Sequence, residues 1–166
     1  TIATVALTDE SGNWDLDATS TTAVRRGDAW SLSGVRSFVT DGALANLILV
    51  PATTDAGLSL FAVEGDAPGL VRESLATMDQ TRKQGHLVLD DVPATLVGEE
   101  GGATPGLETT MQMAAAMLAA EQVGGAQRVL DRAVEYAKSR VQFGRPIGSF
   151  QAIKHKCADM LLDVES

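Results

Sequence analysis

The feature that most constrains the fold is a change in hydrophobic period just past the middle of the chain. Up to about Val97, β-branched and apolar residues alternate with polar ones over short runs that end at Gly, Asp or Pro. From about Leu107 to Val141, apolar residues recur at spacings of three and four. The first period is that of a strand and the second that of an amphipathic helix. The sequence therefore predicts an α+β protein, strand-rich first and helical second.

The strand-rich part is typical of an antiparallel β-barrel or sandwich, in which short strands alternate with Gly and Asp turns. We expect a turn at Ser33-Gly34, between two of these strands. The expected strands are Ile2–Leu7, Thr21–Arg25, Ala29–Leu32, Val35–Thr40, Leu47–Val50, Leu58–Val63 and Gly85–Leu89.

The helical part predicts two antiparallel helices, as expected for long helices joined by a short loop. Gly144 and Pro146 stop the first helix, and Ser149 can cap the second. A Gly-rich connector, 98–106, separates the two parts, so we expect domains at 1–104 and 105–166. The helices bury little by themselves. The apolar face of the second helix comprises Phe150, Ile153, Cys157, Met160, Leu161 and Val164.

Composition excludes several classes of function. A net charge of −9 argues against nucleic acid as a partner, because phosphate backbones need clustered Lys and Arg. The single cysteine, Cys157, cannot form an internal disulfide, which favours a reducing, cytoplasmic location. Only His86 and His155 accompany it, without metal-ligand spacing, so we expect no metal site. The longest apolar-rich run, 111–120, is too short to span a membrane.

The two ends of the chain lie inside regular patterns. The sequence starts with Thr1, within an expected strand, and stops at Ser166, within an expected helix. Helices and strands ordinarily end at caps, Gly or Pro. We therefore expect this sequence to be a piece of a longer chain.

A motif at the junction of the helices is specific. The run 136–151 reads Tyr-Ala-Lys-Ser-Arg-Val-Gln-Phe-Gly-Arg-Pro-Ile-Gly-Ser-Phe-Gln. It resembles the helix-turn-helix signature of the acyl-CoA dehydrogenases, in which Arg-x-Gln-Phe-Gly precedes a Phe-Gln that opens the next helix. Ala158-Asp159-Met160 continues the resemblance.

The strand-rich part agrees with that resemblance. The run 32–42 resembles the family's Gly-x-Lys-x-Trp/Phe-Ile-Thr-Asn strand, and 7–10 resembles its Thr-Glu-Pro flavin loop. The run 89–93 is similar to the family's Phe-Asp-x-Val-x-Val-Pro edge. The resemblance implies the family's middle β-domain, followed by the beginning of a four-helix C-terminal bundle.

The resemblance implies FAD as cofactor and an acyl-CoA thioester as substrate. In the family, a carboxylate removes the Cα proton and a hydride leaves Cβ for the flavin. Leu7 and Thr8 would face the pyrimidine edge of the flavin. Phe38 would pack against its ring system, with the Thr40 hydroxyl near its redox nitrogen. Periodicity alone favours the simpler interpretation, in which Phe38 is a core aromatic and Thr40 an ordinary strand residue.

The resemblance also implies an anchor for the FAD of a neighbouring subunit. Arg140 would reach the adenosine side of that FAD, accompanied by Phe143 and Gln151, and the protein would be an oligomer. A guanidinium presents paired donors suited to phosphate. The alternative for Arg140 is a cation that only compensates the helix dipole.

No catalytic base is predicted within this chain. Most family members carry the base late in the C-terminal domain, beyond Ser166, and some place a Glu on the long helix. That position falls at Ala114 here, followed by Ala115, and alanine cannot accept a proton. Glu108 and Glu121 lie nearby but do not match.

Departures from the family pattern leave alternatives open. Asn13-Trp14-Asp15 stands where the family has Gly-Ser-Asp, and Asp9 where it has Glu. The chain could therefore belong to a non-catalytic partner subunit of a heteromeric enzyme, or be a plain interaction domain. The small side chains on the long helix would admit a long or ring-bearing acyl group. By resemblance, the electron acceptor is an electron-transfer flavoprotein and the pathway one of fatty acid or lipid metabolism.

Overall fold

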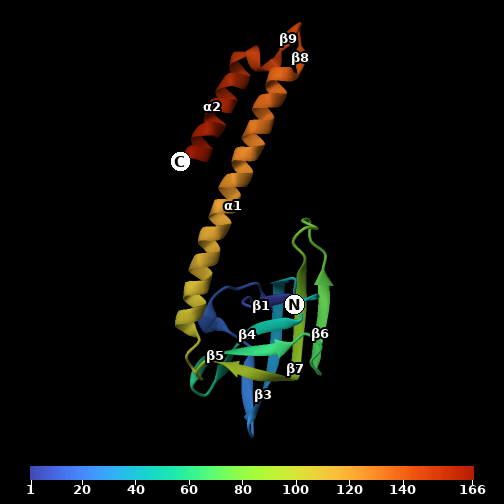
Figure 1. The fold of residues 1–166 in the computed structure, drawn as a ribbon, viewed down its shortest axis with the longest axis vertical. Helices are drawn as coiled ribbons and strands as arrows, with labels where there is room; N and C mark the ends of the chain where they lie inside the picture. Colours follow the sequence, from blue (N-terminus) through green and yellow to red (C-terminus); the bar gives the residue numbers. More distant parts are fainter. The chain divides into compact units, whose positions relative to one another are not determined.

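The computed structural model describes all 166 residues, which divide into two compact units, Thr1–Glu108 and Thr109–Ser166 (Figure 1). The first unit holds seven strands. They are β1 (Ala3–Val5), β2 (Thr22–Arg26), β3 (Ala29–Thr40), β4 (Leu47–Thr54), β5 (Gly57–Glu64), β6 (Leu70–Leu75) and β7 (Gln84–Val97). A 3-10 turn, η1 (Leu16–Ala18), lies between β1 and β2.

The seven strands form one sheet that closes into a ring. β2 pairs with β3, β3 with β7, β7 with β5, β5 with β4, and β4 with β2. β1 extends the sheet from β4, and β6 extends it from β7. The closed set of pairings decides for the barrel over the sandwich. The ladders are antiparallel except at β1–β4 and β2–β4.

The barrel interior is apolar because inward-facing residues alternate with outward-facing ones along each strand. The centroids of the Trp30 and Phe61 rings lie 5.3 Å apart within this interior. Removal of this apolar surface from water supplies the main driving force for folding of the first unit. The cluster comprises Ala6, Ala23, Trp30, Leu32, Val39, Ala45, Ile48, Val50, Ala52, Phe61, Val63, Leu87, Leu89 and Val92.

The expected turn at Ser33-Gly34 is wrong, because β3 runs unbroken from Ala29 to Thr40. Gly34 instead marks a register shift against β7. A Cβ at Gly34 would lie 2.6 Å from Thr21 Oγ1, so the glycine serves close packing rather than a reversal. The sequence reading also missed β6 and shortened β7.

The second unit holds most of a 36-residue helix, α1 (Thr104–Ser139), and a shorter helix, α2 (Gln151–Glu165). Between them lie the two-residue strands β8 (Val141–Gln142) and β9 (Arg145–Pro146) and a 3-10 turn, η2 (Ile147–Ser149). Figure 1 shows α2 returning beside the last turns of α1, as two antiparallel helices should.

Two details of the helical expectation are corrected. The first helix ends at Ser139, before Val141, because the chain enters the β8–β9 hairpin. Ser149 does not cap α2. It lies in η2, and Phe150 occupies the cap position without a side-chain hydrogen bond. Neither helix has the length and apolarity needed to cross a membrane.

Candidate functional site

The segment after β1 is fastened to β3 by bonds outside the strand ladder. The Ser37 N–H donates to the Thr8 carbonyl at 3.3 Å, and the Thr8 hydroxyl donates back to the Ser37 carbonyl. The Arg36 guanidinium donates from Nη1 to the Leu7 carbonyl at 3.1 Å. Leu7 and Thr8, both predicted flavin contacts, are therefore held in one fixed conformation against β3.

The N–H groups of Leu7 and Thr8 have no acceptor within the chain. Thr8 is nonetheless buried, at 4% exposure. Buried backbone donors are nearly always paired with backbone, side chain or another molecule. The unpaired donors at this position are what a ligand with acceptor atoms, such as the pyrimidine edge of a flavin, would satisfy.

Phe38 lies in a β-bulge with unusual backbone geometry. The β3–β7 register shifts between Arg36 and Val39, and Phe38 has φ of +56°. A bulky residue at positive φ is strained, and such strain persists mostly at functional sites. The bulge turns the ring outward, so that Phe38 is 49% exposed rather than a core aromatic.

The loop after Thr8 lies against the Phe38 ring. A Cβ added at Gly12 would come within 3.1 Å of Phe38 Cε2, so the loop backbone approaches the ring edge closely. Asp9 Oδ1 shapes this loop by accepting from the Ser11 hydroxyl at 2.7 Å, the Ser11 N–H at 2.8 Å and the Asn13 N–H at 3.0 Å. These bonds, the Ser11 hydroxyl foremost, lower the pKa of Asp9. Trp14 follows with its indole 60% exposed.

Thr40 closes the first group of candidate residues at the end of β3. Its carbonyl accepts from the Thr4 hydroxyl at 2.6 Å, while its own hydroxyl has no partner within the chain. Thr40 is exposed, so this hydroxyl is available to a ligand. The structure thus gathers Leu7, Thr8, Phe38 and Thr40 around β3 and the segment that it anchors.

The second group of candidate residues lies in the helical unit. Phe143 and Gly144 have φ of +53° and +75°, the signature of a type I′ turn, which is well matched to the twist of the β8–β9 hairpin. The base of the hairpin is closed because the Ile147 N–H, which follows β9, donates to the carbonyl of Arg140, which precedes β8, at 2.7 Å. Phe143 is 90% exposed at the hairpin tip.

The aromatic and basic side chains around this hairpin are ordered by each other. Phe143 meets Phe150 edge-on, with centroids 6.1 Å apart, and the Arg145 guanidinium lies 4.2 Å from the Phe150 centroid. Gln151 begins α2 and bonds His155 at 2.9 Å. The exposed Arg140 guanidinium makes no hydrogen bond or ion pair within the chain, so it is free to bind an anion.

Position 114 on α1, where some members of the resembled family place a Glu, is an alanine here and carries no proton acceptor. Ala114 and Ala115 are both exposed there, and Glu108 and Glu121 are exposed elsewhere on the helix. No group of three or more His, Cys, Asp or Glu residues is arranged to hold a metal ion.

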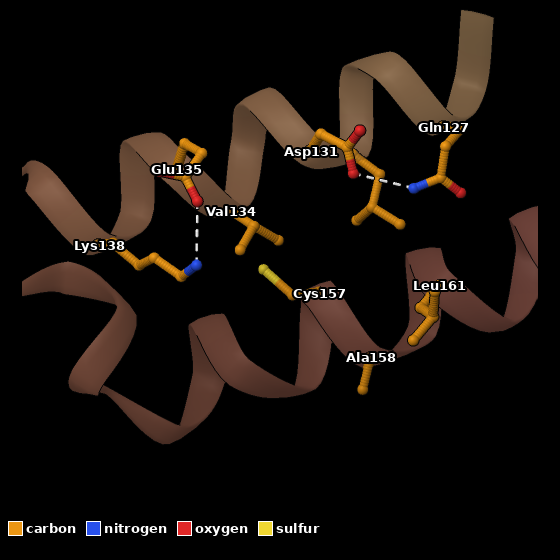
Figure 2. Close-up of a pocket in the computed structure, with 9 residues that line it drawn as sticks. Gln127, Asp131, Val134, Glu135, Lys138, Cys157, Ala158 and Leu161 are labelled. Atoms are coloured by element: carbon orange, nitrogen blue, oxygen red, sulfur yellow. Dashed lines mark hydrogen bonds and ion pairs between the residues drawn. The ribbon is translucent and has the colours of Figure 1, made fainter. Parts of the chain in front are cut away.

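An open groove of about 470 Å³ lies between the last turns of α1 and α2 (Figure 2). Its floor is apolar, with Val134 facing Cys157 across the gap, and the Glu135–Lys138 ion pair at 2.9 Å borders it. The polar side chains of its lining are paired with each other, Gln127 with Asp131 at 2.9 Å and Glu135 with Lys138. The groove therefore fits packing by an apolar segment better than binding of a polar ligand.

Comparison with known families matches almost the whole chain. Residues 4–92 match the acyl-CoA dehydrogenase middle domain, and residues 104–166 match the acyl-CoA dehydrogenase C-terminal domain. The matched ranges contain both groups of candidate residues.

Relatives agree with those matches. Cyclohex-1-ene-1-carbonyl-CoA dehydrogenase of Geobacter metallireducens is 34% identical over 99% of this chain and 46% of that protein. A solved variant of the Tcur3481-Tcur3483 steroid acyl-CoA dehydrogenase is 42% identical over 98% of this chain and 43% of its own, with a TM-score of 0.82. A chain in the electron transferring flavoprotein structure of Acidaminococcus fermentans is 34% identical, with coverages of 98% and 46% and a TM-score of 0.91. This chain spans about half the length of these relatives.

Proposed function

The chain belongs to the acyl-CoA dehydrogenase family, and we propose that the whole protein catalyses FAD-dependent α,β-dehydrogenation of an acyl-CoA thioester. The observation that carries the proposal is the pairing of an outward, strained Phe38 with unpaired donors at Leu7 and Thr8. An apolar ring face beside convergent backbone donors suits a flat heteroaromatic ring with a polar edge.

Each residue of the first group has a distinct role in this proposal. The Leu7 and Thr8 N–H groups bind the polar edge of the flavin ring. Phe38 packs against the ring and excludes water, and the free Thr40 hydroxyl donates a hydrogen bond to it. FAD, when bound, would supply the acceptor for the hydride that leaves Cβ of the substrate.

Arg140, Phe143 and Gln151 form the proposed anchor for the distal part of an FAD. The Arg140 guanidinium is unpaired, which is the state expected of a group reserved for a phosphate. Ordering of the hairpin by Phe150 and Arg145 fixes Phe143 beside it. We propose that this anchor serves the FAD of a neighbouring subunit, so that the enzyme is an oligomer.

The carboxylate that removes the Cα proton comes, in this proposal, from a part of the protein outside the 166 residues. Ala114 and Ala115 offer no such group. The small side chains on α1 would leave room for a bulky, ring-bearing acyl group. The names of two relatives, a cyclohexene carbonyl-CoA dehydrogenase and a steroid acyl-CoA dehydrogenase, support that choice.

The electron acceptor and location complete the proposal. An electron-transfer flavoprotein is the proposed acceptor, supported by the similarity to a chain in such a structure. We propose a reducing, cytoplasmic location, which the single cysteine supports. The pathway would be one of lipid metabolism.

A second candidate function is that of a non-catalytic partner subunit. It is favoured by Trp14, an exposed bulky indole in the loop beside Phe38 where the family has a small Ser. In that case Arg140 would serve a partner's FAD while the subunit's own cleft stays empty.

The test is the visible absorption spectrum of the purified full-length protein, before and after anaerobic addition of an acyl-CoA mixture. A flavin band that bleaches supports the dehydrogenase. A protein that stays colourless after incubation with FAD contradicts it and favours the partner subunit. Comparing turnover of ring-bearing acyl-CoAs with that of butyryl-CoA tests the substrate class, which a sharp preference for butyryl-CoA would contradict.

A further inference from the structure

Arg36 is a charged side chain inside the barrel. It is 1% exposed. Nη1 donates to the Leu7 carbonyl at 3.1 Å and Nη2 to the Pro51 carbonyl, while Nε has no partner. The side chain forms no ion pair with any carboxylate of the chain. Two backbone carbonyls are thus the only direct partners of a buried guanidinium.

This arrangement is costly for stability. Taking a guanidinium out of water is unfavourable unless a counter-charge and a full set of acceptors replace the water. Burial lowers the pKa of Arg36 to about 10, opposed by the negative charge of Asp9. The side chain therefore remains charged at neutral pH, and the barrel interior carries a fixed positive charge with incomplete compensation.

The charge lies directly behind the proposed flavin contacts. The carbonyl that Nη1 holds belongs to Leu7, whose N–H is one of the unpaired donors. Arg36 also precedes Ser37, which is bonded to Thr8. Phe38 comes next, in the bulge. One side chain therefore supports both the segment that would meet the polar edge of the ring and the strand that would meet its face.

We propose that Arg36 is a positioning residue for the flavin. It fixes the Leu7–Thr8 segment, and its charge stabilises the reduced flavin relative to the oxidised one. This inference rests on the proposed function. The physical reason is charge balance, because a hydride brings two electrons and one proton to a neutral ring and leaves it with one negative charge. A fixed cation in a low-dielectric interior favours that state without reorganising.

The experiment measures the two-electron reduction potential of FAD bound to the full-length protein and its Arg36→Met, Arg36→Gln and Arg36→Lys variants. We expect the neutral variants to lower the equilibrium constant for reduction at least tenfold, a shift of about 30 mV. Arg36→Lys keeps the charge but cannot hold both carbonyls. It should change the equilibrium constant for reduction by less than about threefold, while weakening FAD binding.

Arg72→Met is the matched control. Arg72 lies on β6, outside the candidate residues, and likewise donates to a backbone carbonyl, that of Ala45, at 2.9 Å. It should leave both the potential and the FAD dissociation constant unchanged. A comparable shift in this variant would mean that loss of any barrel arginine alters the flavin, and would overturn the proposal.

The remaining outcomes separate the inference from the function on which it rests. A neutral variant that binds FAD with the wild-type potential overturns the role of Arg36 and leaves the dehydrogenase intact. Failure of both neutral variants to fold assigns Arg36 to the barrel alone and also overturns it. If the wild-type protein binds no FAD, the proposed function itself has failed.

Discussion

The two units differ in how completely they bury their apolar side chains. The barrel of the first unit encloses a contiguous core, in which Phe61 is the largest apolar side chain that is fully buried. In the second unit, residues 112–126 of α1 are exposed throughout, including Met113, Met117 and Val123. A closed barrel pairs and buries its own elements, whereas two helices have too few faces to cover each other. The first unit therefore buries its own apolar core, whereas the helical unit leaves a long run of α1 uncovered.

Core truncations give the largest expected contrast between the units. Phe61→Ala should lower the free energy of unfolding by about 3–5 kcal/mol, because it leaves a cavity against Trp30. Val129→Ala, on the exposed face of α1, should change it by less than about 0.5 kcal/mol in the 166-residue chain. Urea unfolding followed by far-ultraviolet circular dichroism measures both, since both tryptophans lie in the first unit. Equal losses would show that the helical unit has a core of its own.

The proposed FAD anchor in the helical unit can be compared with the proposed flavin contacts of the barrel. Arg140→Ala in the full-length protein should weaken FAD binding by about 1.5–3 kcal/mol, the usual worth of a hydrogen bond to a charged group. The dissociation constant can be measured from flavin fluorescence. Arg132→Ala, an exposed arginine on α1, is the control and should have no effect. Equal losses of FAD affinity in the two variants would show that Arg140 contributes only as one surface charge among others.

Glycine substitutions should change stability in opposite directions in the two units. A Cβ at Gly65 would lie 2.2 Å from the Ala45 carbonyl oxygen, so Gly65→Ala should cost about 1–3 kcal/mol. Nothing lies within 4 Å of a Cβ at Gly124, so Gly124→Ala should stabilise the 166-residue chain by about 1 kcal/mol through helix propensity. Thermal unfolding measures both.

The full-length protein sharpens the Gly124 prediction. There, Gly124→Ala should lose its benefit if other protein packs closely on this part of α1. A stabilisation that persists unchanged would contradict the view that the exposed helix face is covered in the whole protein.

The smallest expected effect is the pH dependence of the loop over Phe38. The pKa of Asp9 is lowered by its bonds to Ser11 and Asn13. Its contribution to stability is therefore present above the unfolded-state pKa, near 4, and is lost as pH falls through the lower folded-state value. The stability advantage of the wild type over Asp9→Asn should shrink as pH falls from 5 to 2. Urea unfolding across that range measures it, and a constant difference would contradict the prediction.

The sequence predicted the helices and most of the strands, because the hydrophobic periodicity that indicates them is a local feature. The predicted turn at Ser33-Gly34 is wrong, because Gly34 permits a close approach to Thr21 that only strand packing creates. Ser149 failed as a cap because the hairpin and η2 place Phe150 at that position instead. β6 was missed, although it pairs with the next strand, β7, because Leu70–Leu75 lacks a regular alternation of apolar and polar residues.

The succession of strands and helices, the family and the candidate residues of each motif can all be predicted from the sequence, because hydrophobic period and motifs are local features. Only the tertiary structure decided that the sheet closes into a barrel, that Phe38 turns outward from a bulge, and that the charge of Arg36 is buried behind Leu7. Those features depend on register and burial across strands far apart in the chain, and no local pattern encodes them.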